Sequence, residues 1–126
     1  MGTGYLLDTN SIIDFSAKRL SDKAHKYIAR IIDEFPQISI INKIELLGFA
    51  NVPQQIIVFT ENAFVISLDD DIAAQTIHLR KEYKIKLPDA IIAATAIVFD
   101  LTLVTNNTDD FKNIKGLDIL NPYSLF

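Results

Sequence analysis

The chain of 126 residues has a single-domain length, and its composition, 49% hydrophobic and 22% charged, is that of an ordinary globular protein. Its net charge of −4 provides no overall positive field to attract nucleic acid, so any such contact requires a local basic patch. The lack of cysteine excludes disulfides, thiolate catalysis and cysteine-ligated zinc, and it fits a reducing compartment. No secretory signal opens the sequence and no apolar stretch is long enough to cross a bilayer, so we expect one soluble, cytoplasmic domain over residues 1–126.

The first half of the chain alternates apolar runs bounded by turn formers with apolar residues at helical spacing. In chain order these patterns predict a strand, a short helix, a long helix, a second strand and two more helices: residues 4–7, 11–16, 22–35, 38–41, 43–50 and 53–62. We expect Ser21 or Asp22 to cap the long helix and Pro36 to end it. Asn42 is expected to cap the helix that follows the second strand.

The second half continues this alternation and predicts a strand, a helix, a helix buried on most sides, a strand and a short edge strand: residues 64–66, 69–79, 88–99, 101–104 and 118–120. The consecutive aspartates 69–71 favour a helix first turn through capping and the helix dipole. They suit a metal poorly because neighbouring side chains point in different directions. Residues 105–110 are expected to form a polar loop. Strands that alternate with helices predict an α/β fold with a parallel sheet covered by helices on both faces.

Four acids fall where this topology places the ends of strands. Asp8 follows the first strand, and Glu45 is expected in the first turn of the helix after the second strand. Asp89 begins the buried helix, and Asp110 follows the fourth strand. Because the carboxyl ends of parallel strands meet at one edge of a sheet, we expect the four side chains to gather there. Each acid taken alone also fits a helix-capping or first-turn role.

Four ionised carboxylates at one edge repel one another. Two carboxylates about 5 Å apart repel by roughly 3 kcal/mol at an effective dielectric constant near 20, and four of them form six pairs. A marginally stable domain tolerates this only if some carboxylates stay protonated, with raised pKa values, or if a cation binds among them. Oxygen ligands without histidine or cysteine select a hard divalent ion, Mg²⁺ or Mn²⁺. Such an ion can activate water for attack on a phosphodiester.

A nucleic-acid substrate would also need positive charge beside the acids. The basic residues nearest to them in the sequence precede Glu45 or run up to Asp89: Lys43, Arg80, Lys81, Lys84 and Lys86. We interpret these residues as a rim that holds the backbone of a nucleic acid; the alternative is an ordinary solvated helix face and loop.

Four segments in this chain match one known family in order and over nearly the whole length: Leu6-Leu7-Asp8-Thr9-Asn10, Ile44-Glu45-Leu46, Leu87-Pro88-Asp89-Ala90 with the apolar helix after it, and Leu103-Val104-Thr105-Asn106-Asn107 with Asp110-Phe111. Together they resemble the PIN domain, and within it the VapC-type toxin ribonucleases of prokaryotic toxin–antitoxin pairs. Asp8-Thr9-Asn10 alone would be a weak signal; the set is specific.

The resemblance implies a Rossmann-like three-layer α/β/α sandwich with a short central, mostly parallel sheet. It also implies an Mg²⁺- or Mn²⁺-dependent endoribonuclease, a homodimer and a cognate antitoxin that inhibits it. Asp8, Glu45, Asp89 and Asp110 match the catalytic and metal-binding acids, and Asn10, Thr105 and Asn107 match supporting positions. Asn107 stands where some relatives place a further aspartate. Whether Asn107 or Asp109 takes part in the site, and whether one or two ions bind, stays open.

Three other classes are compatible with parts of the sequence. A non-catalytic module could keep the fold and bind RNA or protein without cutting, although intact acids at all four positions argue against it. A haloacid-dehalogenase-like phosphatase needs a second aspartate where Asn10 stands. A receiver domain needs an acidic pair before its central aspartate, and the segment before Asp8 has no acid.

Overall fold

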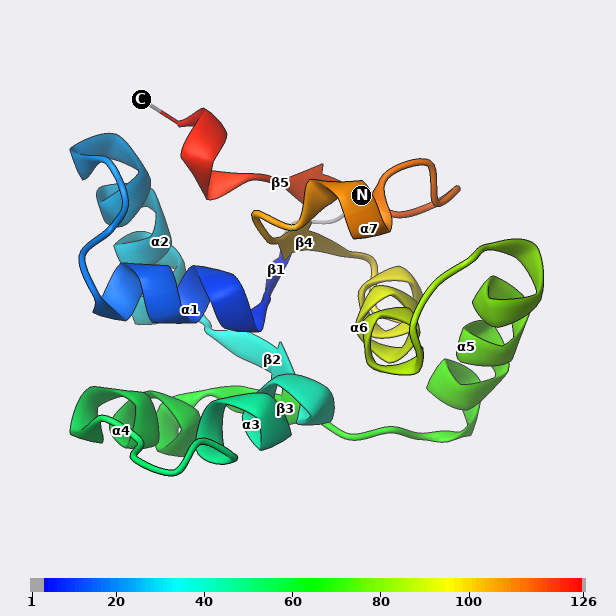
Figure 1. The fold of residues 1–126 in the computed structure, drawn as a ribbon, viewed down its shortest axis with the longest axis horizontal. Helices are drawn as coiled ribbons and strands as arrows, with labels where there is room; N and C mark the ends of the chain where they lie inside the picture. The colour runs from blue at the N-terminus through cyan, green and yellow to red at the C-terminus, as the bar shows by residue number, and fades with distance from the viewer. Residues whose placement is uncertain (1–3, 126) are drawn as a thin grey trace.

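The computed structural model describes residues 4–125, which form alternating strands and helices (Figure 1). Their order is β1 (Gly4–Leu7), α1 (Thr9–Ser16), α2 (Asp22–Glu34), β2 (Gln37–Ser39), α3 (Ile40–Leu47), α4 (Gln54–Asn62), β3 (Phe64–Ile66), α5 (Asp70–Glu82), α6 (Leu87–Val98), β4 (Leu101–Val104), α7 (Thr108–Phe111), β5 (Ile119–Leu120) and the 3₁₀ helix η1 (Pro122–Ser124). None of the helices in this part of the chain is long and apolar enough to span a membrane.

All strand pairs among the described residues are parallel, as the alternation of strands and helices predicts. One sheet has the order β1-β4-β5, and β2 pairs with β3. In the first sheet Leu6 is in register with Leu103, and Leu7 with Val104. The Gln37 side chain donates a hydrogen bond to the Tyr5 carbonyl at 3.3 Å, which links β2 to β1. Because β1 and β4 pair in parallel with Leu7 opposite Val104, their carboxyl ends lie next to each other.

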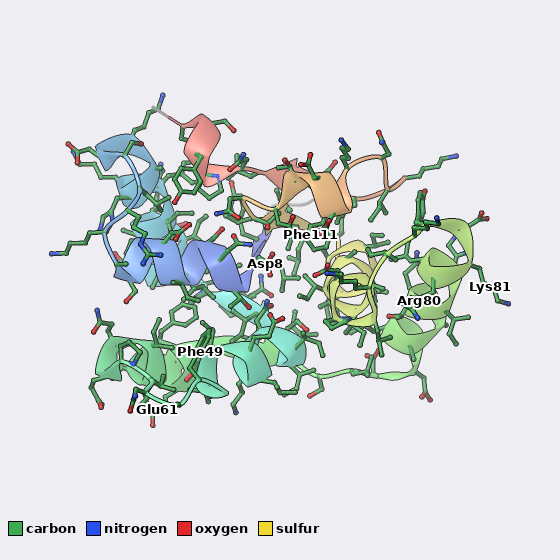
Figure 2. All side chains as sticks on the ribbon, viewed as in Figure 1. Asp8, Phe49, Glu61, Arg80, Lys81 and Phe111 are labelled. Atoms are coloured by element: carbon green, nitrogen blue, oxygen red, sulfur yellow. The ribbon has the colours of Figure 1, made fainter. Side chains whose placement is uncertain are left out.

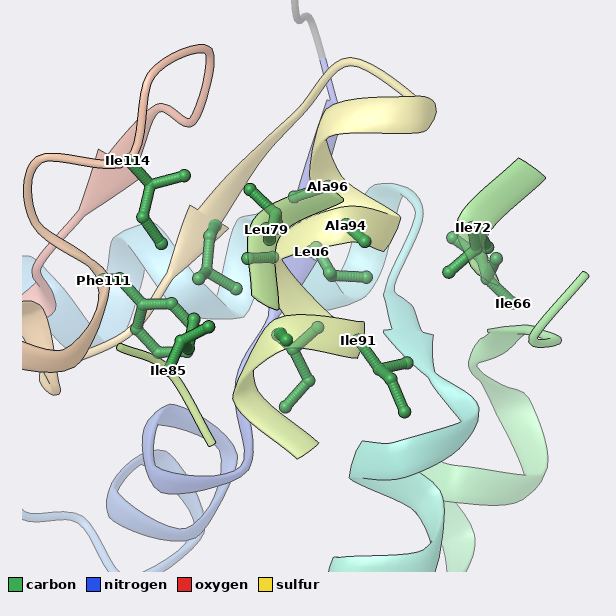
Figure 3. Close-up of a cluster of buried hydrophobic side chains, with 14 residues drawn as sticks. Leu6, Ile66, Ile72, Leu79, Ile85, Ile91, Ala94, Ala96, Phe111 and Ile114 are labelled. Carbon is green, nitrogen blue, oxygen red and sulfur yellow. The ribbon is translucent and has the colours of Figure 1, made fainter. Parts of the chain in front are cut away.

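Helices cover both faces of the strands, which confirms the predicted α/β layering. Leu6 and Leu7 are both fully buried, but alternate side chains of a strand point to opposite faces. Leu6 packs with buried residues of α5, α6 and α7, including Leu79, Ile92 and Phe111 (Figure 3). Leu7 belongs to a second cluster with residues of α1, α2, α3 and α4. The strand ends are thus held between two cores.

The apolar helix α6 is buried on nearly every side, as its composition predicts. Residues 90–96 are all buried, and four of these seven are alanines that allow close packing. Pro88 lies in the first turn of α6, where its missing N–H costs no hydrogen bond. Asp89 follows in the same turn and is half-buried at the edge of the helix.

The segment after β2 differs from its prediction. The strand ends at Ser39, and α3 begins at Ile40, so residues 40–41 are helical. Ser39 caps this helix by accepting a hydrogen bond from Ile41 N, and Asn42 Oδ1 accepts from Ser39 N at 2.9 Å. Asn42 is therefore the third residue of the helix, where it completes a capping box with Ser39, and not the cap itself. In consequence Glu45 lies in the second turn of α3.

Two further helix starts test the sequence predictions. The aspartates at 69–71 do open a helix: Asp69 caps α5 by accepting from Ile72 N at 2.8 Å. The predicted polar loop at 105–110 is shorter than expected, because α7 begins at Thr108 with Asp109 and Asp110 in its first turn. Acidic residues stabilise a helix N-terminus through its dipole, which explains this short turn.

Candidate active site

Asp8 lies where β1 ends and α1 begins, near the middle of the molecule (Figure 2). It caps α1, and its residue is only 5% exposed. Four donors reach its carboxylate: Thr9 N at 2.9 Å, Asn10 Nδ2 at 3.2 Å, Asn42 Nδ2 at 3.1 Å and Thr105 Oγ1 at 2.7 Å. Burial raises the pKa of Asp8, and these hydrogen bonds act in the opposite direction. These four uncharged donors thus fix the orientation of the carboxylate.

One hydrogen-bond chain joins Asp8 to Glu45. Asn42 is fully buried, and its side-chain amide donates both to Asp8 Oδ1 and to Thr9 Oγ1, each at 3.1 Å. The Thr9 hydroxyl then donates to Glu45 Oε1 at 2.6 Å. The strand end, α1 and α3 are connected in this way, and two acids that are 37 positions apart come to the same edge.

A second chain joins Asp8 to Asp110. The buried Thr105 hydroxyl, which donates to Asp8, accepts from Asn107 N at 3.0 Å. The Asn107 side-chain amide donates to Asp110 Oδ2 at 2.9 Å. Asn107 therefore orients Asp110 through its side-chain nitrogen.

The pKa of Asp89 is raised by burial and by the other three acids. Burial is the largest cause that raises its pKa. The next causes are the negative charges of Asp110, Asp8 and Glu45, in that order, while the Lys86 ammonium lowers the pKa. A carboxyl group responds to three other acids only when all four lie in one region, because such interactions fall off with distance. The prediction that the acid cluster raises a carboxyl pKa is confirmed at Asp89.

An open cleft of about 530 Å³ runs past these acids. Its lining combines three of them with polar and apolar neighbours: Asp8, Thr9, Asn10, Ile13, Ile44, Glu45, Gly48, Phe49, Asp89 and Asn107. A slightly larger cavity of about 600 Å³ lies between α1, α2 and α4, but its lining is mostly apolar and includes none of the four acids. The chemistry is therefore gathered in the open cleft.

Comparison with known proteins identifies the family of the chain. The family model of the PIN domain matches residues 5–117. The chain belongs to the PIN domain family. The four acids therefore lie in the fold that this family shares. No curated protein matches the chain.

Several solved structures resemble this PIN domain over nearly its whole length. A chain of a toxin–antitoxin complex from Klebsiella pneumoniae is 35% identical, with a TM-score of 0.77, and the match covers 95% of this chain and 98% of that one. A chain of VapBC2 from Rickettsia felis, bound to a promoter DNA fragment, is 27% identical, with a TM-score of 0.76 and coverage of 93% and 97%. For FitAcB from Neisseria gonorrhoeae the identity is 25%, the TM-score 0.72 and the coverage 96% and 99%.

The donor set of this PIN domain fits a hard divalent cation, since carboxylate and amide oxygens are the ligands that Mg²⁺ and Mn²⁺ prefer. Within residues 4–125, however, no group of three or more acidic or histidine side chains is already spaced to hold a metal ion. Glu45 and Asp110 instead accept hydrogen bonds from Thr9 and Asn107. The acids share one region without forming a preassembled ligand set.

The predicted basic rim separates into two groups. Lys86 directly precedes α6, and its ammonium lowers the pKa of Asp89. Arg80 and Lys81 lie on α5, on the other side of α6 from Asp8 (Figure 2). The Arg80 guanidinium donates to the Ile85 carbonyl at 2.7 Å, so it braces the loop that carries Lys84. Lys43 is half-buried on α3, two residues before Glu45.

Two polar residues of the site have a larger role than the sequence predicts. The sequence places Thr9 only in a turn and Asn42 only at a helix start, yet together they connect Asp8 to Glu45. A signal for Asn42 is present, because Ser39-x-x-Asn42 has the spacing of a capping box. That spacing places the asparagine inside the first helical turn, where its amide can reach back to the strand end.

Proposed function

We propose that this chain is an Mg²⁺- or Mn²⁺-dependent endoribonuclease that hydrolyses RNA phosphodiester bonds, and that it acts as the toxin of a toxin–antitoxin pair. The observation that carries the proposal is the convergence of four acids on one region: hydrogen-bond chains join Asp8 to Glu45 and to Asp110, and burial together with these three acids raises the pKa of Asp89. The family and the complexes of its relatives support the biological role. The geometry supports the chemistry, because the four described donors to Asp8 are all uncharged and leave its charge for a metal to balance.

Asp8, Glu45, Asp89 and Asp110 are the residues that would hold the metal. When bound, such an ion lowers the pKa of a coordinated water and stabilises charge on the phosphate. Glu45 Oε1 and Asp110 Oδ2 accept hydrogen bonds from Thr9 and Asn107. These hydrogen bonds must break before the same two oxygens can bind the ion. Asp8 is held by its four donors and is therefore the fixed member of the set.

The remaining residues of the cleft orient this set. Thr105 and Asn42 hold opposite oxygens of Asp8, at Oδ2 and Oδ1 respectively. Asp89, with its raised pKa, retains a proton to higher pH than an ordinary aspartate in the metal-free protein. A cation in the cleft would favour release of that proton, because positive charge stabilises the ionised form.

For RNA we assign the phosphate contacts to Lys43, Lys84 and Lys86. Lys84 and Lys86 are exposed in the segment that leads into Asp89, so their positive charge would attract the phosphates of an RNA that approaches the acids. We assign no direct phosphate contact to Arg80 and Lys81; Arg80 supports the loop through Ile85.

The proposed partners are a cognate antitoxin and a second copy of the chain. The solved relatives are toxin–antitoxin complexes, and we extend that pairing to this chain. Large hydrophobic residues exposed on three helices, Ile44, Val58 and Ile77, provide apolar surface that such partners would cover.

An RNA cleavage assay tests the proposal. The purified chain is incubated with generic single-stranded RNA and either Mg²⁺, Mn²⁺ or EDTA, beside Asp89→Asn and the control Asp70→Asn, an exposed acid of α5 outside the cleft. We expect cleavage only with metal, a loss of more than about 100-fold in Asp89→Asn, since outer-shell changes alone cost up to that much, and no change in Asp70→Asn.

Two outcomes would overturn this proposal. Cleavage that persists in EDTA or in Asp89→Asn would show that the acids do not carry the reaction. RNA that binds the wild-type chain but stays intact with either metal would identify a non-catalytic RNA-binding module. The thermal unfolding midpoint, compared in metal and in EDTA, provides a second readout. An ion at about 100 times its Kd stabilises the native state by about 2.7 kcal/mol and should raise this midpoint.

A further inference from the structure

Outside the cleft, a fifth acid connects the C-terminal segment to the site. Asp14 lies on α1, and its residue is 7% exposed. Three segments donate to its carboxylate: the Tyr123 hydroxyl to Oδ2 at 2.8 Å, the Asn106 side-chain amide to Oδ2 at 3.1 Å, and Arg19 Nη1 to Oδ1 at 3.3 Å. Tyr123 belongs to η1, which lies beside α2 near the end of the chain (Figure 1). We call these four residues the Asp14 network.

The network continues to the proposed metal ligands through backbone and side-chain bonds. Asn106 N donates to Asn10 Oδ1 at 3.1 Å. The Asn10 amide donates in turn to Asp8 Oδ2 at 3.2 Å and to Thr105 Oγ1 at 3.1 Å. Asn106 also stands between Thr105 and Asn107 in the chain, the two residues that bond to Asp8 and Asp110. A shift of Asn106 therefore reaches two of the acids by two routes.

The neutral donors carry most of the support for the Asp14 carboxylate. The Arg19 side chain is 61% exposed, and an ion pair at that exposure contributes little because solvent screens it. A buried carboxylate needs hydrogen-bond donors, and the remaining ones come from Asn106 and Tyr123. The hydrogen bond to Asp14 is also the largest cause that raises the pKa of Tyr123, so the phenol keeps its proton as a donor. Asp14 does not line the acid cleft.

We propose that Tyr123, acting through Asp14 and Asn106, is a positioning residue for the carboxylate cluster. The C-terminal 3₁₀ helix thereby fixes the loop after β4, and that loop fixes Asn10 and Asp110. The catalytic part of this inference rests on the proposed nuclease function; the structural coupling does not. Tyr123→Phe removes only the hydroxyl, and the residue is 43% exposed, so the variant should fold.

The first experiment tests the coupling without metal. ¹H–¹⁵N spectra of the metal-free chain are compared for Tyr123→Phe and for the control Ser124→Ala, whose hydroxyl donates to the Asn121 carbonyl beside η1. The amide signals of Asn106 and Asn107 and the side-chain signal of Asn10 should shift in Tyr123→Phe and stay in place in Ser124→Ala. Unchanged signals in Tyr123→Phe, or equal shifts in both variants, would overturn the coupling.

The second experiment asks whether the coupling matters for the site. For wild type and both variants, the unfolding midpoint is measured in EDTA and in Mn²⁺, and kcat and KM are measured on RNA. In Tyr123→Phe we expect a smaller rise of the midpoint with Mn²⁺ and a kcat lower by roughly three- to ten-fold, below the roughly 10- to 100-fold typical of groups bonded directly to a metal ligand. KM should stay unchanged. Asn106→Ala should lower kcat more, and the double variant should add little to it.

The outcomes separate the two proposals. A purely structural Tyr123 would lower the midpoint equally in EDTA and in Mn²⁺ and leave kcat unchanged, which would contradict a positioning role. A wild-type chain that neither binds metal nor cleaves RNA would overturn the nuclease and with it the catalytic part of this inference. The metal-free spectra would then still decide whether Tyr123 controls the loop after β4.

Discussion

Thr105 Oγ1 donates a hydrogen bond of 2.7 Å to Asp8 Oδ2, although the two residues are 97 positions apart. They are brought together because β1 and β4 are adjacent parallel strands that end at the same level. All four described donors to Asp8 are uncharged. They fix the geometry of the carboxylate and leave its negative charge for a cation to balance.

Thr105→Val should weaken both the site and the fold, because it removes the hydroxyl and keeps the shape of the side chain. We expect the free energy of unfolding to fall by about 1–2 kcal/mol, the cost of a buried acceptor that loses a donor. RNA cleavage should fall by about 10- to 100-fold. Thr105→Ser keeps the hydroxyl and should retain most of the activity. Equal cleavage rates in the valine and serine variants would contradict this role of the hydroxyl.

Asn42→Ala should disrupt the link between Asp8 and Glu45 and the cap of α3 together. Its amide donates to Asp8 and Thr9, and its oxygen accepts from Ser39 N. We expect a loss of roughly 1–3 kcal/mol in urea unfolding and a cleavage rate lower by about 10-fold or more. Asn62→Ala, which removes an exposed bond to the Val58 carbonyl, is the matched control and should change neither. Wild-type activity in Asn42→Ala would show that Glu45 needs no such link.

The basic residues beside the acids should contribute to RNA binding, whereas those on α5 should not. Charge reversal at Lys84 and Lys86 should weaken RNA binding and flatten its dependence on salt. The slope of log K against log salt should change by about 0.7 for each RNA phosphate that a lysine no longer neutralises. The double variant Lys81→Glu with His78→Glu on α5 should leave that slope unchanged.

Fluorescence anisotropy with labelled single-stranded RNA, over a series of salt concentrations in EDTA, measures these slopes without cleavage. Identical slopes for wild type and the Lys84/Lys86 variant would remove these residues from the interface.

The metal-free protein should show a pH dependence that arises from Asp89. Burial and the neighbouring acids raise its folded-state pKa, so the folded state keeps this proton to higher pH than the unfolded state does. The contribution of Asp89 to stability is therefore largest below the unfolded pKa of about 3.9 and is lost as the pH rises through the folded pKa. Asp89→Asn should be more stable than wild type at neutral pH in EDTA, and this difference should shrink as the pH falls through the folded pKa towards that unfolded value.

Urea unfolding at intervals across that pH range measures the difference directly. Asp70→Asn, an exposed first-turn acid of α5, corrects for the loss of one negative charge elsewhere. A stability difference between Asp89→Asn and wild type that stays constant with pH would mean that the folded protein does not perturb Asp89.

The topology and the gathering of the acids in one region could be predicted because both depend on local patterns. Short apolar runs predict the strands at 64–66 and 101–104 at their observed positions, and parallel strands necessarily bring their carboxyl ends to one edge. The prediction of a strand at residues 40–41 is wrong because isoleucines favour strands, whereas the capping box of Ser39 and Asn42 makes them helical.

Three further supporting residues, Asn42, Asn106 and Tyr123, could not be predicted, since their partners are distant in sequence. Asn42 reaches Asp8 across 34 positions, Asn106 reaches Asp14 across 92, and Tyr123 reaches Asp14 across 109. The capping-box spacing indicates that Asn42 lies at a helix start, but nothing in the local pattern shows that these three side chains reach Asp8 or Asp14. The pattern also could not show that Arg80 turns toward Ile85 instead of the cleft.

If the four acids share a divalent ion, crystals soaked in Mn²⁺ at neutral pH should reveal it by anomalous diffraction. We predict a manganese peak in the cleft with carboxylate oxygens of Asp8 and Asp89 at about 2.0–2.2 Å, and with Glu45 or Asp110 turned away from its hydrogen-bond partner. A cleft without manganese at saturating concentration, or a peak only at another place on the molecule, would contradict a shared metal site.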